Sequence, residues 1–106
     1  MKEIIFDVMI GKVKEVNMKA DDDITLTIEP LLYRENNVIT DKDVFNAKCD
    51  MKKKEDIDYI KEEMTVGKYV YLNGYINNDD EMHIIGGYKL YSHEIEELAS
   101  FYKIDC

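Results

Sequence analysis

The sequence predicts one all-β domain, a small five-stranded barrel that carries helices, and three observations support this class. The length of 106 residues fits one domain, and 45% hydrophobic residues with a single proline argue against disorder. Residues 69–76 alternate aliphatic side chains with tyrosines, which is typical of a strand with two different faces. Gly74 lies on the aliphatic face, where a missing side chain allows the sharp bend or close approach that a small closed barrel needs.

The first two strands are expected before residue 35. Apolar alternation in residues 4–10 predicts a long first strand that reaches Gly11. Beyond Gly11 the apolar pattern continues out of phase, so we expect the strand to bend or bulge there and to be shared by two sheets. Residues 17–23 are mostly polar and predict a connection. Residues 24–29 alternate again as the second strand, and pairing should weaken or move to an edge at Pro30, which cannot donate to a ladder.

The third strand and a helix occupy the middle of the chain. Residues 38–40 start this strand, the charged residues 41–43 interrupt it, and residues 44–49 complete it with every second side chain from Phe45 on one face. Apolar residues then recur at helical spacing near residues 54–64. Acids lie in the first turn of this segment, where the helix dipole favours them, so a helix is predicted.

Residues 69–76 are interpreted as the fourth strand. The alternative makes Asn73 and Gly74 the tight turn of a hairpin, because Asn-Gly readily adopts positive φ at both positions. Five consecutive polar residues at 77–81 predict the next turn. The fifth strand covers residues 82–91, and its paired glycines at 86 and 87 indicate a bulge or a close approach.

A second helix is expected near residues 93–103. Ser92 should cap it, and an apolar stripe at Ile95, Leu98 and Tyr102 has to pack against the rest of the protein. The whole order is therefore strand, strand, strand, helix, strand, strand, with a C-terminal helix appended. This is the order of the oligonucleotide/oligosaccharide-binding (OB) fold, a partly open five-stranded barrel.

Charge and segment composition restrict function and location. The chain holds 23 acids against 14 bases, a net charge of −9, so most of its surface should repel polyanions. Nucleic-acid binding would then depend on a local basic or aromatic strip. The first residues include acids and no long apolar run, and no segment is long enough to span a bilayer. The two cysteines lack the spacing of metal ligands, and they are too few for a disulfide scaffold. We therefore expect a cytoplasmic protein without membrane contact.

Three stretches carry a family pattern. Residues 9–13 read aliphatic, glycine, basic, aliphatic; residues 45–60 join a strand to a helix; and residues 66–76 read glycine, basic, then alternating aliphatics with Gly74. In these places the chain resembles the bacterial single-stranded DNA-binding proteins. The resemblance implies an OB fold and a role in replication, repair or a mobile element. It also implies a tryptophan for base stacking and a glycine- and glutamine-rich tail, and this chain has neither.

The expected ligand cleft lies between two acidic loops. In an OB fold, strands two and three line the cleft, and the loops joining strands one to two and four to five flank it. These loops hold the acids of residues 21–23 and 79–81, which oppose counterion release. A basic and aromatic strip between them is the candidate site for single-stranded DNA or RNA, and ordinary solvated surface is the alternative. The strip consists of Lys12, Lys14, Lys19, Tyr33, Arg34, Lys48, Tyr75, Tyr88 and Lys89.

The tyrosines of the fourth strand suggest a second function. Tyr69, Tyr71 and Tyr75 share one face, and tyrosine suits half-buried strands, subunit interfaces and helix packing, where an apolar ring and a polar tip are both useful. The alternative function is therefore an acidic protein-interaction module, with a protein partner or a second copy on this face and no nucleic acid.

No residue pattern supports catalysis or a bound cofactor. The sequence has no phosphate-binding loop, dinucleotide fingerprint or nucleophile elbow. His83 and His93 lack companions at metal-ligand spacing, and Cys49 lies in an apolar strand pattern typical of a small buried residue. We therefore expect no enzyme activity, no metal and no cofactor.

Overall fold

The structure, a computed structural model, describes residues 4–102 and is mostly β. Neither helix in this part of the chain is long and apolar enough to cross a membrane. The elements are β1 Ile4–Ala20, β2 Asp23–Glu35, β3 Val38–Ile39, β4 Phe45–Cys49, α1 Lys54–Glu63, β5 Tyr69–Ile76, β6 Met82–Leu90 and α2 Ser92–Tyr102.

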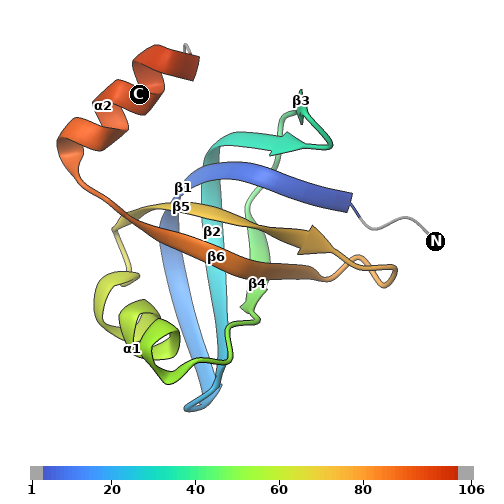
Figure 1. Cartoon of the computed structure of the whole chain (residues 1–106), viewed down its shortest axis with the longest axis vertical. Helices are drawn as coiled ribbons and strands as arrows, with labels where there is room; N and C mark the ends of the chain where they lie inside the picture. The colour runs from blue at the N-terminus through green and yellow to red at the C-terminus, as the bar shows by residue number, and fades with distance from the viewer. Residues whose placement is uncertain (1–3, 103–106) are drawn as a thin grey trace.

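Five of the strands form a ring. The sheet order is β1-β5-β6-β4-β2-β3, and an additional pairing of β1 with β2 closes the circuit and leaves β3 outside it. The pairing of β4 with β6 is parallel, and the other pairings are antiparallel. The helix α1 joins β4 to β5 below the ring, and α2 follows β6 and rises beside its other end (Figure 1). The result is a compact, mostly β domain with two helices.

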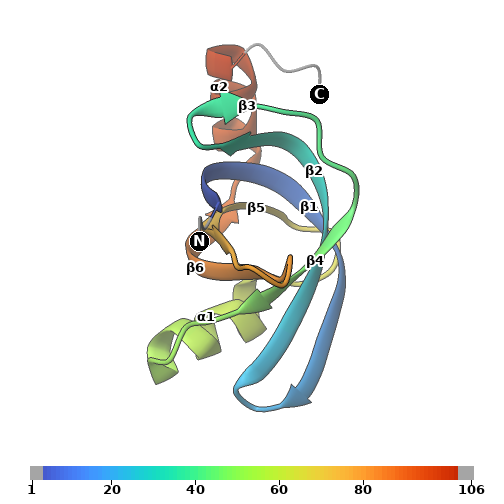
Figure 2. The same ribbon diagram turned by 90° about the vertical axis from the view of Figure 1, so that its right-hand side faces the viewer.

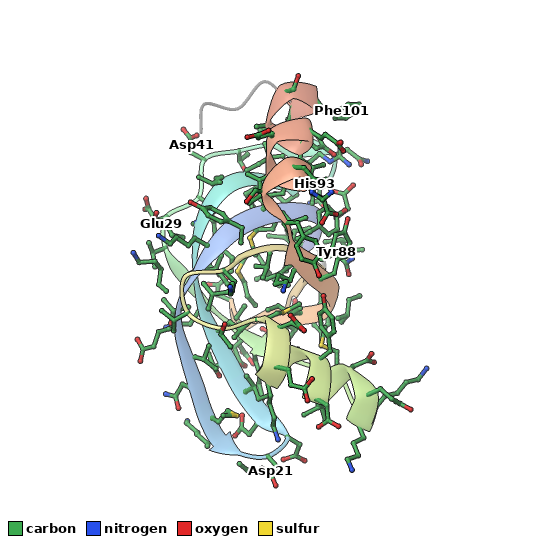
Figure 3. The ribbon with its side chains drawn as sticks, turned by 90° about the vertical axis from the view of Figure 1, so that its left-hand side faces the viewer. Asp21, Glu29, Asp41, Tyr88, His93 and Phe101 are labelled. Carbon is green, nitrogen blue, oxygen red and sulfur yellow. The ribbon has the colours of Figure 1, made fainter. Side chains whose placement is uncertain are left out.

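The first hairpin is longer than the sequence predicts. Residues 17–20 belong to β1 and pair with the start of β2, so the turn is only two residues long and the predicted polar connection at 17–23 is wrong. Figure 2 shows the hairpin extending past the ring beside α1, and Figure 3 places Asp21 at its tip, at the opposite end from Phe101 on α2. Residues 17–20 are exposed on both faces of β1, so they carry no apolar alternation.

The irregularity expected at Gly11 is confirmed as a register shift, but β1 continues through it within a single sheet, so the expected passage between two sheets is wrong. The register of β1 against β2 shifts between Ile10 and Gly11, which lies opposite Pro30. A Cβ on Gly11 would lie 2.6 Å from Ile28 Cγ2 and 2.7 Å from the Glu29 carbonyl oxygen, so the two strands approach closely here. The pairing of β2 with β4 ends at Ile28, two residues before the proline, as its missing N–H predicts.

The expected third strand is two separate strands. Asn36 and Asn37 have positive φ values of 48° and 67°, and this turn sends Val38 back to pair with Glu35 of β2. Residues 38 and 39 therefore form β3 at the edge of the sheet, while β4 begins only at Phe45. Alternation within β4 is as predicted, since every second side chain from Phe45 points inward and the last two are buried.

The strand β5 confirms the predicted faces. Val70, Leu72 and Ile76 point into the ring, and the chain runs straight through Asn73 and Gly74, so the hairpin alternative is wrong. A Cβ on Gly74 would collide with the carbonyl oxygen of His83, and this close approach coincides with a register shift between β5 and β6. The unpaired residue at the shift is Ile85 on β6, whose side chain is exposed.

Two apolar clusters hold the domain together. The main one fills the ring and includes Ile60 and Met64 from the α1 region, which close one end. The second lies on the outside of the ring, where the predicted stripe of α2 covers a small set of strand residues. Its buried members are Val8, Ile10, Leu32 and Leu90, and the half-buried ones are Leu31, Tyr69, Tyr71, Ile95, Leu98 and Tyr102.

The start of α2 differs from the prediction. Ser92 is the first helical residue, and Tyr91 precedes the helix as its cap position. The carboxylate of Glu94 accepts a hydrogen bond from the Tyr91 amide at 3.0 Å, the reciprocal half of a capping box. Residue 103, the expected end of this helix, lies outside the described residues.

Candidate functional site

An open groove crosses the outer surface of the ring at β4. Residues from the β1–β2 hairpin, from β4 and from the β5–β6 loop enclose a volume of about 400 Å³. We call it the β4 groove. Its lining residues are Lys19, Asp23, Thr25, Asn46, Lys48, Asp80, Glu81 and Met82.

A second hollow of about 480 Å³ continues the β4 groove toward the open end of the ring. The two share Asn46, Asp80 and Met82, so they form one continuous depression. The ring of Phe45 and the Lys42 side chain line the second hollow, and the Lys42 ammonium lies 5.9 Å from the centre of the Phe45 ring. Charged side chains therefore line both parts of the depression, and aliphatic and aromatic residues join its lining at the end of the ring.

Strand alternation places the polar side chains in the groove. In β2 the even-numbered residues 24, 26 and 28 are buried, so Thr25 and Thr27 face outward. The pairing of β2 with β4 sets Thr25 beside Lys48 and Thr27 beside Asn46. The Thr27 hydroxyl donates to Asn46 Oδ1 at 2.7 Å, which fixes the amide and leaves its NH₂ group as a donor toward ligand.

Charges in the β4 groove are mixed. Among the described residues, no carboxylate lies within ion-pair distance of Lys19 or Lys48, so both ammonium groups are open to a ligand. Asp23, Asp80 and Glu81 line the same depression and are likewise outside ion pairs in this part of the chain. Two lysines therefore face three carboxylates, and the groove attracts anions only through a local arrangement of its cations.

The side chain of Asn77 holds the β5–β6 loop in shape. Its Oδ1 accepts hydrogen bonds from the amides of Asp79 and Glu81, both at 3.0 Å. The backbone N–H of Asn77 donates to the Glu81 carbonyl oxygen at 3.0 Å, and Asp80 takes a positive φ of 59°. These bonds fix the loop, and with it the two acids that line the groove.

Four of the six predicted cations lie outside the groove, and three of these four are ion-paired. Arg34 forms a bidentate ion pair with Asp7, with hydrogen bonds of 2.7 and 3.0 Å, and these bonds lower the pKa of the Asp7 carboxyl. Lys89 bonds Glu63 at 2.7 Å, which raises the pKa of the lysine. Lys14 lies 3.8 Å from Glu29, and Lys12 is half-buried on β1. Of the predicted cations, the structure brings only Lys19 and Lys48 into the groove.

The predicted stacking tyrosines occupy three different environments. Tyr33 is only 1% exposed, its hydroxyl donates to Glu35, and burial raises its pKa, so it offers no ring face to a base. Tyr33 points into the ring as part of the main cluster, whereas its neighbour Leu32 belongs to the outer cluster that packs with α2. Tyr88 is 44% exposed and stacks on Tyr71 at 5.1 Å. Tyr75 stacks on His83 at 4.9 Å.

The tyrosine face of β5 has contacts within the chain. Tyr69 and Tyr71 pack with the α2 stripe, and the Tyr71 hydroxyl donates to the Asp7 carbonyl at 2.9 Å. Tyr75 lies further along β5 and donates to Asp50 Oδ2 at 3.0 Å. Helix packing, one of the roles expected for these rings, therefore accounts for two of the three tyrosines.

Sequence reasoning missed Thr25 and Asn46 as groove residues. Alternation in β2 and β4 already predicts that both face outward, but their meeting depends on the register between strands that are twenty residues apart. No group of three or more potential metal ligands occurs among residues 4–102. Burial raises the pKa of the Cys49 thiol to about 12, so this cysteine is not a ready nucleophile.

The chemistry of the groove is that of binding by hydrogen bonds and charge. Its donors are two ammonium groups and one oriented amide, and its acceptors are carboxylates and a threonine hydroxyl. Comparison of the chain with models of known protein families, with curated proteins and with solved structures finds no match. The assignment of the groove therefore depends on its own residues and on the strands around it.

Proposed function

We propose that this chain is an OB-fold module that binds single-stranded nucleic acid in the β4 groove. The strand order supports the fold. Taking β1, β2, β4, β5 and β6 as the five OB strands, α1 stands between the third and the fourth, where the OB fold has its helix. In this scheme β3 and α2 are additions outside the closed circuit.

The position of the groove supports single-stranded nucleic acid as the ligand. In the OB fold, oligonucleotides lie across strands two and three, between the loops that follow strands one and four. The β4 groove lies at the corresponding position in this fold, since β2, β4, the end of the β1–β2 hairpin and the β5–β6 loop contribute its lining residues.

One observation carries the proposal: the groove collects two of the three lysines of the predicted strip that have no ion pair among the described residues, the third being Lys12. Lys19 and Lys48 are free to contact phosphates, whereas Lys14, Arg34 and Lys89 are engaged with acids elsewhere. The Asn46 amide, oriented by Thr27, adds a donor suited to an acceptor on a base edge. Binding through two phosphate contacts should be weak and salt-dependent, with a logarithmic slope of about −1.4 on a single strand.

A titration of labelled oligothymidine, followed by fluorescence anisotropy at several salt concentrations, tests the proposal. Lys48→Ala should weaken binding and reduce the salt slope by about 0.7, since one phosphate contact is lost. Lys14→Ala is the control, because this lysine lies on β1, the strand that carries Lys19, but pairs with Glu29 outside the groove. It should leave both affinity and slope unchanged.

Neutralising the acidic β5–β6 loop provides a second test in the same titration. Replacing Asp80 by Asn and Glu81 by Gln removes repulsion from the groove, so binding should tighten at low salt and the gain should shrink at high salt. If the folded parent and this variant both leave oligothymidine and oligouridine unbound at low salt, the nucleic-acid function is wrong.

The excess of carboxylates favours a second candidate, an acidic protein-interaction module. Three acids against two lysines suit a basic polypeptide better than a polyanion. Light scattering beside the titration separates the two: salt-dependent binding to the oligonucleotide favours the first function. Absence of binding at low salt, with a stable dimer or larger species, favours the second.

A further inference from the structure

His83 contacts the asparagine that shapes the β5–β6 loop. Its side chain is 14% exposed and lies flat against the ring of Tyr75, with 7° between the ring planes. The Nε2 atom is 3.3 Å from Nδ2 of Asn77. The Nδ1 atom is buried without a hydrogen-bond partner among the described residues, and lies 4.0 Å from Asp50 Oδ2.

The hydrogen bonds of Asn77 determine the tautomer of His83. Asn77 Oδ1 already accepts from the amides of Asp79 and Glu81, so its NH₂ group is the one that faces the imidazole. An NH₂ group only donates, so Nε2 must accept. The neutral ring therefore carries its hydrogen on Nδ1, directed toward Asp50.

A second proton would break this arrangement. It must go to Nε2, where it would face the Asn77 donor across 3.3 Å, and Asn77 cannot turn its amide without giving up both loop bonds. The charged ring would meanwhile be drawn to the Asp50 carboxylate, which follows β4 and also accepts from the Tyr75 hydroxyl.

Other charges near the ring come from two elements. The Glu81 carboxylate of the loop lies 3.5 Å from the Asn77 amide nitrogen, and Lys48 of β4 is the register partner of His83. Among the described residues, Asp50 is the only one whose carboxylate lies within 4.0 Å of a ring nitrogen, so protonation strengthens the contact with Asp50 and loses the contact with Asn77.

We propose that His83 is a pH-sensitive latch for the β5–β6 loop. The neutral ring holds Asn77 and keeps the loop closed, and the protonated ring releases it. Because Asp80 and Glu81 of this loop line the β4 groove, release withdraws two carboxylates from the groove and favours anionic ligands. Only this last consequence rests on the proposed function; the latch itself does not.

Nuclear magnetic resonance of the ¹⁵N-labelled protein between about pH 8 and pH 5 tests the latch, since unperturbed imidazoles titrate in this range. The amide signals of Asp79 and Glu81 should shift with the midpoint of the His83 ring. Their hydrogen-exchange protection factors should fall about two- to tenfold, as expected for one lost hydrogen bond. His93, exposed on α2 and away from this loop, is the internal reference (Figure 3).

Two variants make the test specific. His83→Gln keeps an acceptor for Asn77 and cannot be protonated, so the loop amides should stay protected across the range, whereas His93→Gln should behave as the parent. Asp50→Asn removes the attraction for the charged ring, so the His83 and loop midpoints should move together to lower pH. If His83→Gln does not fold, the midpoints measured in Asp50→Asn test the latch instead.

Three results would overturn the latch: loop amides that ignore the His83 titration, a His83 ring that stays neutral down to about pH 5, or a loop response retained in His83→Gln. Oligothymidine binding at constant ionic strength is a separate arm. The parent should gain affinity over His83→Gln on acidification. If no oligonucleotide binds at any pH while the loop amides follow His83, the proposed function fails and the latch stands.

Discussion

Replacing Gly74 by alanine should be the most damaging small change in the chain. The new Cβ would collide with the His83 carbonyl oxygen and lie 2.9 Å from both the His83 carbonyl carbon and Phe6 Cζ. Phe6 is fully buried and the other neighbour is backbone, so β5 and β6 must separate at this point. Overpacking with the loss of one or two ladder hydrogen bonds should cost about 3–5 kcal/mol. That is a large part of the about 5–15 kcal/mol that stabilises a domain.

Urea unfolding followed by circular dichroism measures this cost against two other glycines. Gly86→Ala meets only the Asn73 side-chain amide, at 3.0–3.5 Å, which can rotate away, so its effect should stay within about 0.5 kcal/mol. Gly67→Ala has open space but a φ of +92°, so it should lose about 1–2 kcal/mol through backbone strain. A cost for Gly74→Ala within about 1 kcal/mol of that for Gly86→Ala would refute the close approach of β5 and β6.

Three further variants test other parts of the fold. Leu72→Ala empties a fully buried position in the ring and should cost about 2–5 kcal/mol in urea unfolding, while a loss below about 1 kcal/mol would contradict its inward face. Replacing Tyr71 and Tyr75 together by alanine should lower stability through their contacts within the chain but leave the molar mass by light scattering unchanged; a lower mass would show that they join subunits. Arg34 holds the pKa of Asp7 below 3.8, so their bond stabilises the folded state above that pH and this contribution is lost as the pH falls through the lowered pKa. The difference in unfolding free energy between the parent and Asp7→Asn should therefore be full at neutral pH and shrink below pH 3.8, and a difference that grows on acidification would reverse the sign.

The strand faces were predictable because alternation is a local property. The inward residues of β5 and β4 and the helical stripe of Ile60 and Met64 all follow from side-chain periodicity. The close approach at Gly74 was predictable for the same reason, since only a residue without a side chain fits that face. The length of the first hairpin was not predictable in this way, because its exposed residues bury neither face and leave no apolar pattern.

The candidate site depended on contacts that no local pattern encodes. Arg34 and Lys89 looked equivalent to Lys19 and Lys48 as exposed cations, but each of the first two meets an acid from a distant element. Tyr33 was expected to offer a stacking surface, but the register shift between β1 and β2 near Pro30 reverses the alternation of β2 and turns this ring into the main cluster.

By itself, the sequence determined which side chains share a face within β4, β5 and the two helices, because backbone periodicity acts over a few residues. Only the tertiary structure decided which faces meet. The register of β2 against β4 places Thr27 beside Asn46, and the β5–β6 turn brings Asn77 to His83. Such pairings depend on ring closure and on the register between strands, and these are set by packing of the whole core rather than by any one segment.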